Sequence, residues 1–179
     1  MNCRGCGVPK TLIKAHIIPR AFYMDLRDGE NHLNVLSSEA DVRTRRSFIG
    51  DYDRDILCAD CDNFIGRFDE YGKTAILDNV FEMIPISKAG MVAGWQIKGC
   101  DPVFLQKFIL AILWRASISS RSFFRRVKLG PYDSILRDYL WSEDRQHPAF
   151  GVTFAKFRPS SMVPSVEKTI LDPGKPLVS

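Results

Sequence analysis

The stretch Cys58-Ala59-Asp60-Cys61, together with the earlier Cys3-Arg4-Gly5-Cys6, is the strongest indication of the fold in this sequence. Two C-x-x-C pairs separated by a long segment are typical of a tetrahedral site in which four thiolates hold one Zn²⁺. Such a site is structural, and its apparent binding free energy in small metallo-domains reaches about 10 to 16 kcal/mol. We therefore expect one structural zinc ion, bound by Cys3, Cys6, Cys58 and Cys61.

A redox dithiol or a pair of disulfides is the alternative for these cysteines. A thioredoxin-type site needs one C-x-x-C beside a βαβ pattern, whereas this chain has two pairs with loop-like interiors. The start Met1-Asn2-Cys3 lacks the apolar run of a secretion signal, so we expect a reducing, cytoplasmic compartment in which disulfides are disfavoured. Cys100 is then a leftover thiol that serves packing.

The composition allows a real hydrophobic core, because 45% of the 179 residues are hydrophobic and 11% are aromatic. Composition shifts near residues 90–94 divide the chain into a zinc-bound region, 1–90, and a mainly helical extension with an extended proline-rich tail, 91–179. No apolar stretch approaches the roughly 18 residues of a membrane span, so no membrane role is expected. A net charge of +4 does not by itself indicate nucleic-acid binding.

Hydrophobic periodicity and proline positions predict the local structure. The expected elements are an extended segment at 11–18, a short helix at about 20–27, a strand at 32–37, and helices at 62–73, from 102 onward and at 132–141. The helix at 62–73 should turn its apolar side chains toward the core, namely Phe64, Ile65, Phe68 and Tyr71. Arg115 lies in an apolar helix and needs an acidic partner or a groove, because an unpaired buried charge is too costly.

Three polar residues near the cysteines are candidates for chemistry. His16 lies near the end of an apolar extended segment, within the zinc-bounded stretch, by which we mean the residues between the two C-x-x-C pairs. A neutral imidazole there can accept a proton from water, although a lone histidine is more often structural. Asp62 and Asp69 share one side of the predicted helix, with Gly66 leaving a notch between them. Capping alone is an open alternative for Asp62, since an acid at a helix N-terminus stabilises it by about 0.5 to 2 kcal/mol.

The order of these motifs resembles the HNH (His-Asn-His) endonuclease family over about residues 1–75: C-x-x-C, then His16-Ile-Ile-Pro19, then C-x-x-C and a polar helix. The resemblance implies an α+β fold with a zinc-centred treble-clef (ββα-metal) core, here followed by a C-terminal helical extension. It also implies that His16 is the general base that activates water. Asp62 would bind the catalytic Mg²⁺ or Mn²⁺, with Asp69 as a second candidate ligand.

The chain departs from the family pattern at three positions. Ala15 stands where many members have an acid, Asp62 replaces the usual final histidine, and the middle asparagine falls near Asp53. Asp53 or Asp55 is a candidate to orient His16 through its other ring nitrogen. Two functions therefore stay open: a divalent-metal-dependent nuclease that hydrolyses phosphodiester bonds, and a catalytically inactive zinc-binding module for nucleic acid or a protein partner, in a phage or bacterial defence setting.

Basic residues form two clusters that suit phosphate contacts, Arg43, Arg45 and Arg46 in the zinc-bounded stretch and Arg125 and Arg126 in the second half. A solvated charged surface is the ordinary alternative for both. Phosphate contacts carry no sequence information, so we expect weak sequence preference and strong salt dependence, with DNA favoured over RNA. The helical half offers a surface for a protein partner.

Overall fold

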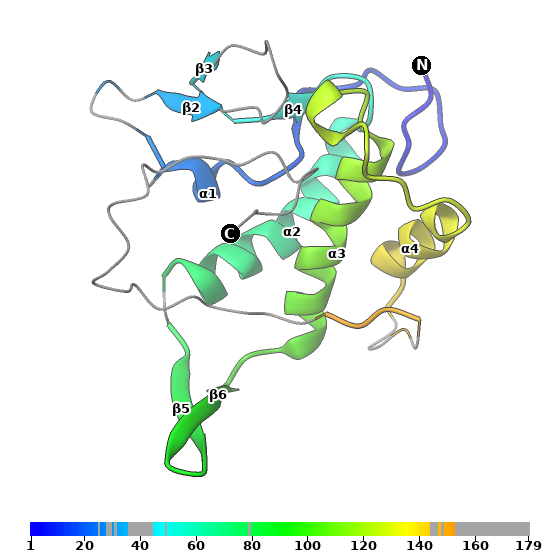
Figure 1. Ribbon diagram of the computed structural model, residues 1–179. Helices are drawn as coiled ribbons and strands as arrows, with labels where there is room; N and C mark the ends of the chain where they lie inside the picture. The colour runs from blue at the N-terminus through cyan, green and yellow to red at the C-terminus, as the bar shows by residue number, and fades with distance from the viewer. Residues whose placement is uncertain are drawn as a thin grey trace.

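The computed structural model describes residues 1–24, 26–27, 30, 32–35, 45–48, 50–78, 80–143, 147 and 149–152 (Figure 1). Within them the elements are β1 (Ala15–His16), α1 (Ala21–Met24), β2 (Leu33–Val35), β3 (Arg45–Ser47), β4 (Tyr52–Asp53), α2 (Ala59–Ile76), β5 (Glu82–Lys88), β6 (Met91–Lys98), α3 (Pro102–Ile118), a 3-10 turn η1 (Ser122–Phe124) and α4 (Tyr132–Trp141). The strands form three small antiparallel pairs, β1–β4, β2–β3 and β5–β6. The fold is therefore mixed α and β, as predicted.

The N-terminal segment folds as a tight turn followed by short strand pairings. The Cys3 N–H donates to the Val8 carbonyl at 3.0 Å, and the Gly7 N–H donates back to the Cys3 carbonyl at 2.8 Å. Further along, Leu12 forms a β-bridge with Cys58, and β1 pairs with β4 so that His16 lies opposite Tyr52. These pairings bring the first C-x-x-C turn and the segment that carries His16 up to the start of α2.

Helix α2 begins at Ala59, three residues before the predicted start, because Cys58 rather than Asp62 is its N-cap residue. Its core-facing residues recur at three- and four-residue steps, with Ile65 and Phe68 buried as predicted. Phe64 and Tyr71 lie half-buried at the edges of this face. The helix can approach α3 closely because Gly72 has no side chain, and a Cβ there would lie 2.4 Å from the ring of Phe108.

Helices α3 and α4 complete the core. The side chain of Asp101 caps α3 by accepting hydrogen bonds from the N–H groups of Val103 and Phe104, and Pro102 occupies the first turn. As predicted, α3 is buried on several sides, and α4 has the predicted bounds. The core joins both halves of the sequence and includes Cys3, Ala15, Ile17, Leu57, Ile65, Leu110, Trp114, Leu136 and Leu140. None of the described helices is long and apolar enough to cross a membrane.

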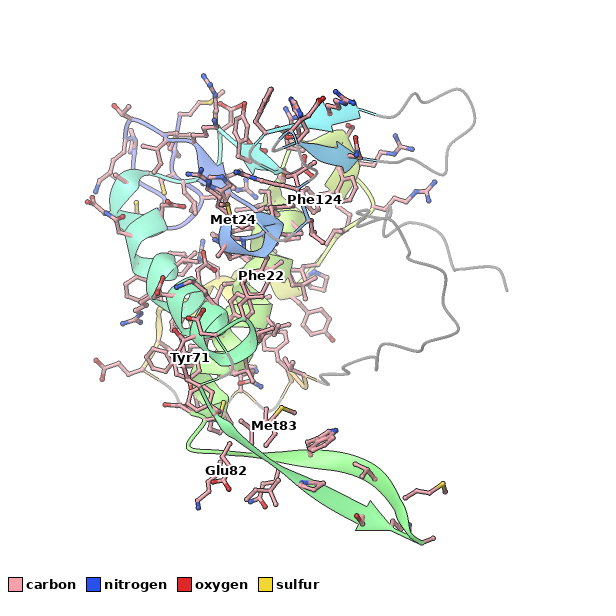
Figure 2. The ribbon with its side chains drawn as sticks, turned by 90° about the vertical axis from the view of Figure 1, so that its left-hand side faces the viewer. Phe22, Met24, Tyr71, Glu82, Met83 and Phe124 are labelled. Atoms are coloured by element: carbon pink, nitrogen blue, oxygen red, sulfur yellow. The ribbon has the colours of Figure 1, made fainter. Side chains whose placement is uncertain are left out.

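Strands β5 and β6 form a hairpin that the sequence analysis did not predict, and it projects from the body of the protein (Figures 1 and 2). Both turn residues, Ala89 and Gly90, have positive φ values, as primed hairpin turns require. Figure 2 shows Glu82 and Met83 at the base of the hairpin, beyond Tyr71. The division expected at residue 90 thus falls in this turn, and the predicted extended tail lies outside the described residues.

Candidate metal centre and neighbouring acids

The four cysteines of the C-x-x-C pairs form one cluster. The Sγ atoms of Cys3, Cys6, Cys58 and Cys61 all lie within 4.8 Å of one another. Four Zn–S bonds of about 2.3 Å in tetrahedral geometry place the sulfurs about 3.8 Å apart, so the cluster fits one zinc ion. The predicted ligand set is therefore brought together, and it is compatible with structural zinc.

The backbone around the cluster explains why the sulfurs converge. The first pair lies in the tight turn after Asn2, and Cys58 and Cys61 are the N-cap and first-turn residues of α2. The Cys58 N–H donates to the sulfur of Cys3 at 3.3 Å, which couples the turn directly to the helix. An N–H donor and the positive end of a helix both favour a thiolate over a thiol.

The surroundings act on the pKa values of two of the thiols in opposite directions. Burial alone raises the pKa of Cys3, but N–H groups of Cys6, Cys58 and Gly5 hydrogen-bond to its sulfur and bring the pKa down to about 7. Burial raises the pKa of Cys61 well above its usual range, and hydrogen bonding with the neighbouring cysteine sulfurs raises it further. The N–H donors around Cys3 therefore suit a thiolate, which is the form that binds a metal ion.

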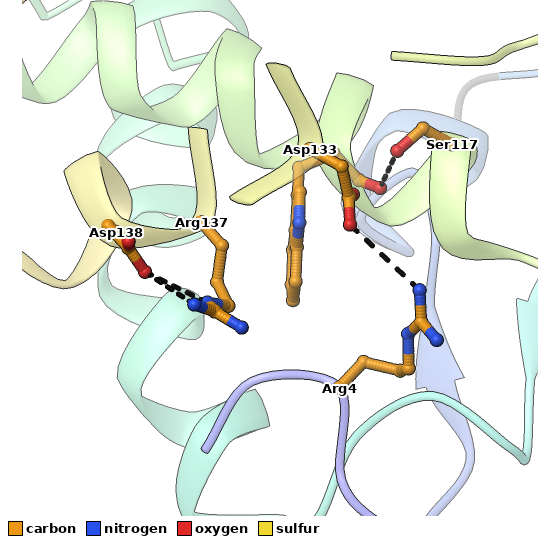
Figure 3. Close-up of polar contacts among 6 residues, drawn as sticks. Arg4, Ser117, Asp133, Arg137 and Asp138 are labelled. Atoms are coloured by element: carbon orange, nitrogen blue, oxygen red, sulfur yellow. Dashed lines mark hydrogen bonds and ion pairs between the residues drawn. The ribbon is translucent and has the colours of Figure 1, made fainter. Parts of the chain in front are cut away.

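Helix α4 supports the cysteine turn from outside. A Cβ at Gly5 would lie 2.8 Å from the Cys61 sulfur and 3.0 Å from the Trp141 ring, so only glycine fits between the turn and these residues. The neighbouring Arg4 forms an ion pair with Asp133 of α4 at 3.9 Å (Figure 3). Both partners of this pair are solvent-exposed, so its contribution to stability is small, at most about 1 kcal/mol. Close packing at Gly5 therefore matters more for this junction than the charges do.

His16 is held rigidly at the end of β1. The residue is half-buried and the Nε2 atom of its ring is buried, and the ring centroid lies 6.4 Å from that of Tyr52, its partner across the β1–β4 pair. The next residue, Ile17, donates its N–H to the carbonyl of Asp51 at 3.1 Å, and the Asp51 N–H is 3.4 Å from the Tyr23 hydroxyl. Strand pairing therefore fixes the backbone on both sides of the imidazole.

Asp53, a candidate to orient His16, instead anchors the end of α3. Its buried Oδ2 accepts hydrogen bonds from the Ser119 hydroxyl and from the N–H and hydroxyl of Ser120, at 2.8 to 3.0 Å. Burial raises the pKa of Asp53, but these bonds and one from the Asp55 N–H outweigh it and hold the pKa below its usual value. Because Asp53 pairs with Ala15 and His16 pairs with Tyr52, Asp53 and His16 lie on opposite faces of the strand pair.

Asp69, the second candidate metal ligand, is paired with Arg115. The two terminal guanidinium nitrogens donate to its two carboxylate oxygens at 2.7 Å each. The Arg115 side chain is only 1% exposed and that of Asp69 is 17% exposed, so this is a buried bidentate pair. The acidic partner expected for Arg115 is therefore Asp69. A divalent ion at Asp69 would have to displace the guanidinium.

Asp62 has a different environment from the other two acids. Its carboxylate is half-buried and makes no hydrogen bond or ion pair with any residue in the described part of the chain. Burial raises its pKa, the charge of Arg115 lowers it, and the charge of Asp69 raises it again. Asp62 is in the first turn of α2 but makes no capping hydrogen bond through its side chain. The carboxylate therefore remains available for a cation.

The sequence analysis missed the buried residues that lie between these groups. Tyr23 and Asp51 are both buried, and the charge of Arg115 acts on Tyr23, whose pKa is raised mainly by burial. The one feature of the sequence that points to this region is Gly50, directly before Asp51. In the structure it has φ +72°, and a Cβ there would lie 2.3 Å from the Tyr23 ring. The contacts from Ile17 through Asp51 and Tyr23 thus run from the His16 strand toward Arg115, whereas no described contact joins His16 to Asp62 directly.

The predicted phosphate-binding arginines are not gathered in one place by the described contacts. Arg43 lies outside the described residues, and Arg45 begins β3. Arg46 is exposed and donates to Glu30 at 3.1 Å. Arg125 and Arg126 are exposed and follow the turn η1. Nothing in these positions favours a phosphate site over a solvated surface.

Comparison of the chain with protein-family models, with curated proteins and with solved structures found no match. Membership of the HNH family, expected from the sequence motifs, therefore remains a prediction. The function of this site has to be inferred from its own residues.

Proposed function

We propose that the chain is a zinc-stabilised HNH-like domain of the treble-clef type that hydrolyses phosphodiester bonds of nucleic acid with the help of Mg²⁺ or Mn²⁺. The chain order of its parts supports the proposal: a cysteine turn, a strand that carries His16, a second strand, and a helix that supplies the last two thiolates. The observation that carries it is Asp62, a half-buried carboxylate with no partner among the described residues, next to the thiolate ligand Cys61. A hard cation prefers such an oxygen ligand.

In this proposal each part has one task. The zinc thiolates fix the first turn against the start of α2 and take no part in the reaction. His16, held by the β1–β4 pair, accepts a proton from the attacking water. Asp62 binds the divalent ion, which when bound stabilises the charge that develops on the scissile phosphate and the leaving oxygen.

The alternative is a zinc module that binds nucleic acid or a protein partner without cutting. It is favoured by the engagement of two of the three candidate acids, because Asp53 is hydrogen-bonded to Ser119 and Ser120, and Asp69 is paired with Arg115. Position 15, where many family members have an acid, is a fully buried alanine. A single carboxylate binds Mg²⁺ weakly unless substrate phosphates complete its coordination.

The test is a nicking assay on supercoiled plasmid with Mg²⁺, Mn²⁺ or no divalent ion. We expect His16→Ala and Asp62→Ala each to lower the cleavage rate by about 100-fold or more. Asp60→Ala is the matched control, since Asp60 is an exposed acid in the same helical turn that pairs with Lys10 at 2.6 Å, and its rate should stay within about twofold of wild type.

Full cleavage by both His16→Ala and Asp62→Ala would refute the proposed active site. If the wild type cleaves nothing with either ion but binds nucleic acid in a salt-dependent way, the non-catalytic module is the correct function. Zinc content measured on the same preparations shows that each variant retains the structural site.

A further inference from the structure

Three cationic side chains gather around one aromatic ring beside His16. The Lys14 ammonium lies 3.9 Å from the centroid of the Tyr52 ring, and the guanidinium carbons of Arg54 and Arg121 lie 5.9 and 6.0 Å from it. Tyr52 is the cross-strand neighbour of His16. Lys14 lies just before β1 and Arg54 just after β4, and their distances to the Tyr52 ring place both cations beside the cross-strand neighbour of the imidazole.

These cations have no acidic partner in the part of the chain that the structure describes. Lys14, Arg54 and Arg121 make no ion pair there, whereas cations elsewhere do, among them Arg4, Lys10, Arg46, Lys73, Lys98, Arg115 and Arg137. The two acids next to Arg54 in sequence pair with none of the three cations: Asp55 is exposed, and the buried Asp53 accepts its hydrogen bonds from Ser119, Ser120 and the Asp55 N–H. Like charges brought together without compensation repel one another, and an anion removes that cost.

The fold fixes this arrangement through Asp53. Arg121 is far from Tyr52 in sequence, and it is brought there because Asp53 binds Ser119 and Ser120, the two residues before it. The Arg121 N–H in turn donates to the Ser119 hydroxyl at 3.1 Å. A buried carboxylate on one face of the strand pair therefore holds a guanidinium in place on the other face.

We propose that Lys14, Arg54 and Arg121, arranged around Tyr52, bind the phosphodiester backbone of a nucleic-acid strand and hold it beside His16. Guanidinium forks match phosphate oxygens, and contact with the ring limits the freedom that the long side chains lose on binding. That the strand is held beside His16 for cleavage rests on the proposed function, whereas the binding of the phosphodiester backbone by the three cations does not. The contacts are made to phosphates, so they position a strand without reading its sequence.

The test measures binding of fluorescent duplex and single-stranded DNA by the zinc-loaded protein, without other divalent ions, over a range of salt concentrations. The triple variant Lys14→Gln/Arg54→Gln/Arg121→Gln should reduce the slope of log K against log salt by about 0.9 per lost contact on duplex, and about 0.7 on a single strand. The matched control removes the same net charge elsewhere, at three exposed or ion-paired cations, Lys88, Lys98 and Arg137. Its slope should equal that of the wild type.

A wild-type slope in the triple variant, an equal loss of slope in the control, or no DNA binding by the wild type would each overturn the inference. If the triple variant fails to fold, the exposed single variants Lys14→Gln and Arg54→Gln carry the test, each with a slope lower by about 0.9. His16→Ala should keep the full slope. If the protein binds DNA through the three cations in a salt-dependent way but does not cleave it, this inference is supported and the proposed hydrolase is refuted. If the protein cleaves DNA but the triple variant has the wild-type slope, the hydrolase is supported and this inference is refuted.

Discussion

Replacing Asp69 by asparagine would leave the guanidinium of Arg115 inside the protein without the carboxylate that it pairs with, since Asp62 feels its charge but forms no ion pair with it. The Asp69→Asn side chain keeps nearly the same shape and one carbonyl oxygen, but it loses the negative charge and turns an N–H donor toward another donor. Arg115 cannot escape to solvent, because it is 1% exposed and its Nε also donates to the Ala111 carbonyl at 3.3 Å. The variant therefore removes the negative charge and one of the two hydrogen-bond acceptors, while the volume of the side chain stays nearly the same.

The geometry sets the size of the effect. Opposite unit charges about 4 Å apart interact with about 4 kcal/mol at an effective dielectric constant of about 20. The two donor–acceptor distances of 2.7 Å show a well-formed bidentate pair, and breaking a buried pair by removing one partner costs about 3 to 5 kcal/mol. Because Asp69 retains 17% exposure, we expect the lower part of this range, about 3 to 4 kcal/mol.

Urea unfolding of the zinc-loaded protein measures this loss as a change in the free energy of unfolding. The double variant Asp69→Leu/Arg115→Met removes both charges, and it should recover most of the stability, to within about 1 to 2 kcal/mol of wild type. Together with the single variants Asp69→Leu and Arg115→Met, this double variant completes a double-mutant cycle that gives the coupling between the two side chains. A loss of less than about 1 kcal/mol for Asp69→Asn would refute the reasoning, since it is the value of a solvated surface pair.

Three further variants test the metal site, the acid anchor and the helix contact. We expect metal analysis of the wild type to find one bound zinc ion, and Cys61→Ser should abolish it and destabilise the domain by on the order of 10 kcal/mol. Asp53→Asn should cost about 2 to 3 kcal/mol near pH 7 in urea unfolding. The difference should shrink below about pH 4, because a carboxylate with a lowered pKa stabilises the fold above its unfolded pKa and loses that contribution as pH falls. Asp55→Asn, at an exposed side chain, is the control and should change the stability little near pH 7. Gly72→Ala should lower the free energy of unfolding by about 1 to 3 kcal/mol, because its Cβ would collide with the Phe108 ring of α3, and thermal unfolding should show a lower melting temperature. Gly66→Ala, with no atom within 4 Å of its Cβ, should be neutral or stabilising.

The cysteine cluster and the later helices can be predicted from the sequence, because the patterns that indicate them are local. C-x-x-C spacing fixes two sulfurs within one turn, and apolar periodicity defined the helix at 132–141 with its observed bounds. The sequence predicts a start of α2 three residues too late, because the polar Asp62 follows the last cysteine whereas the N-cap is Cys58. The hairpin after α2 is not predicted, because its glycines are equally typical of a boundary between regions and of a turn.

The roles of the acids were not readable, because their partners are distant in sequence. Asp69 and Arg115 are 46 residues apart, and Asp53 and Ser119 are 66 apart. The sequence shows that a buried arginine needs an acid, but it does not show which of several acids supplies the charge. The gathering of cations around Tyr52 was hidden for the same reason, since Arg121 reaches the ring only through the anchor at Asp53.

These distant pairings also bear on the division expected at residue 90. The serine donors to Asp53 and the cation that pairs with Asp69 come from α3 and the residues just after it, and Trp114 of the same helix is completely buried in the shared core. A fragment of residues 1–90 would therefore keep all four cysteines but leave Asp69 without Arg115, Asp53 without its serine donors and much of the core exposed. We expect this fragment to bind zinc without acquiring a cooperative unfolding transition or dispersed amide resonances. A folded, zinc-bound fragment 1–90 would show instead that the helices are an appended extension, and that the Asp69–Arg115 pair is dispensable for the metal domain.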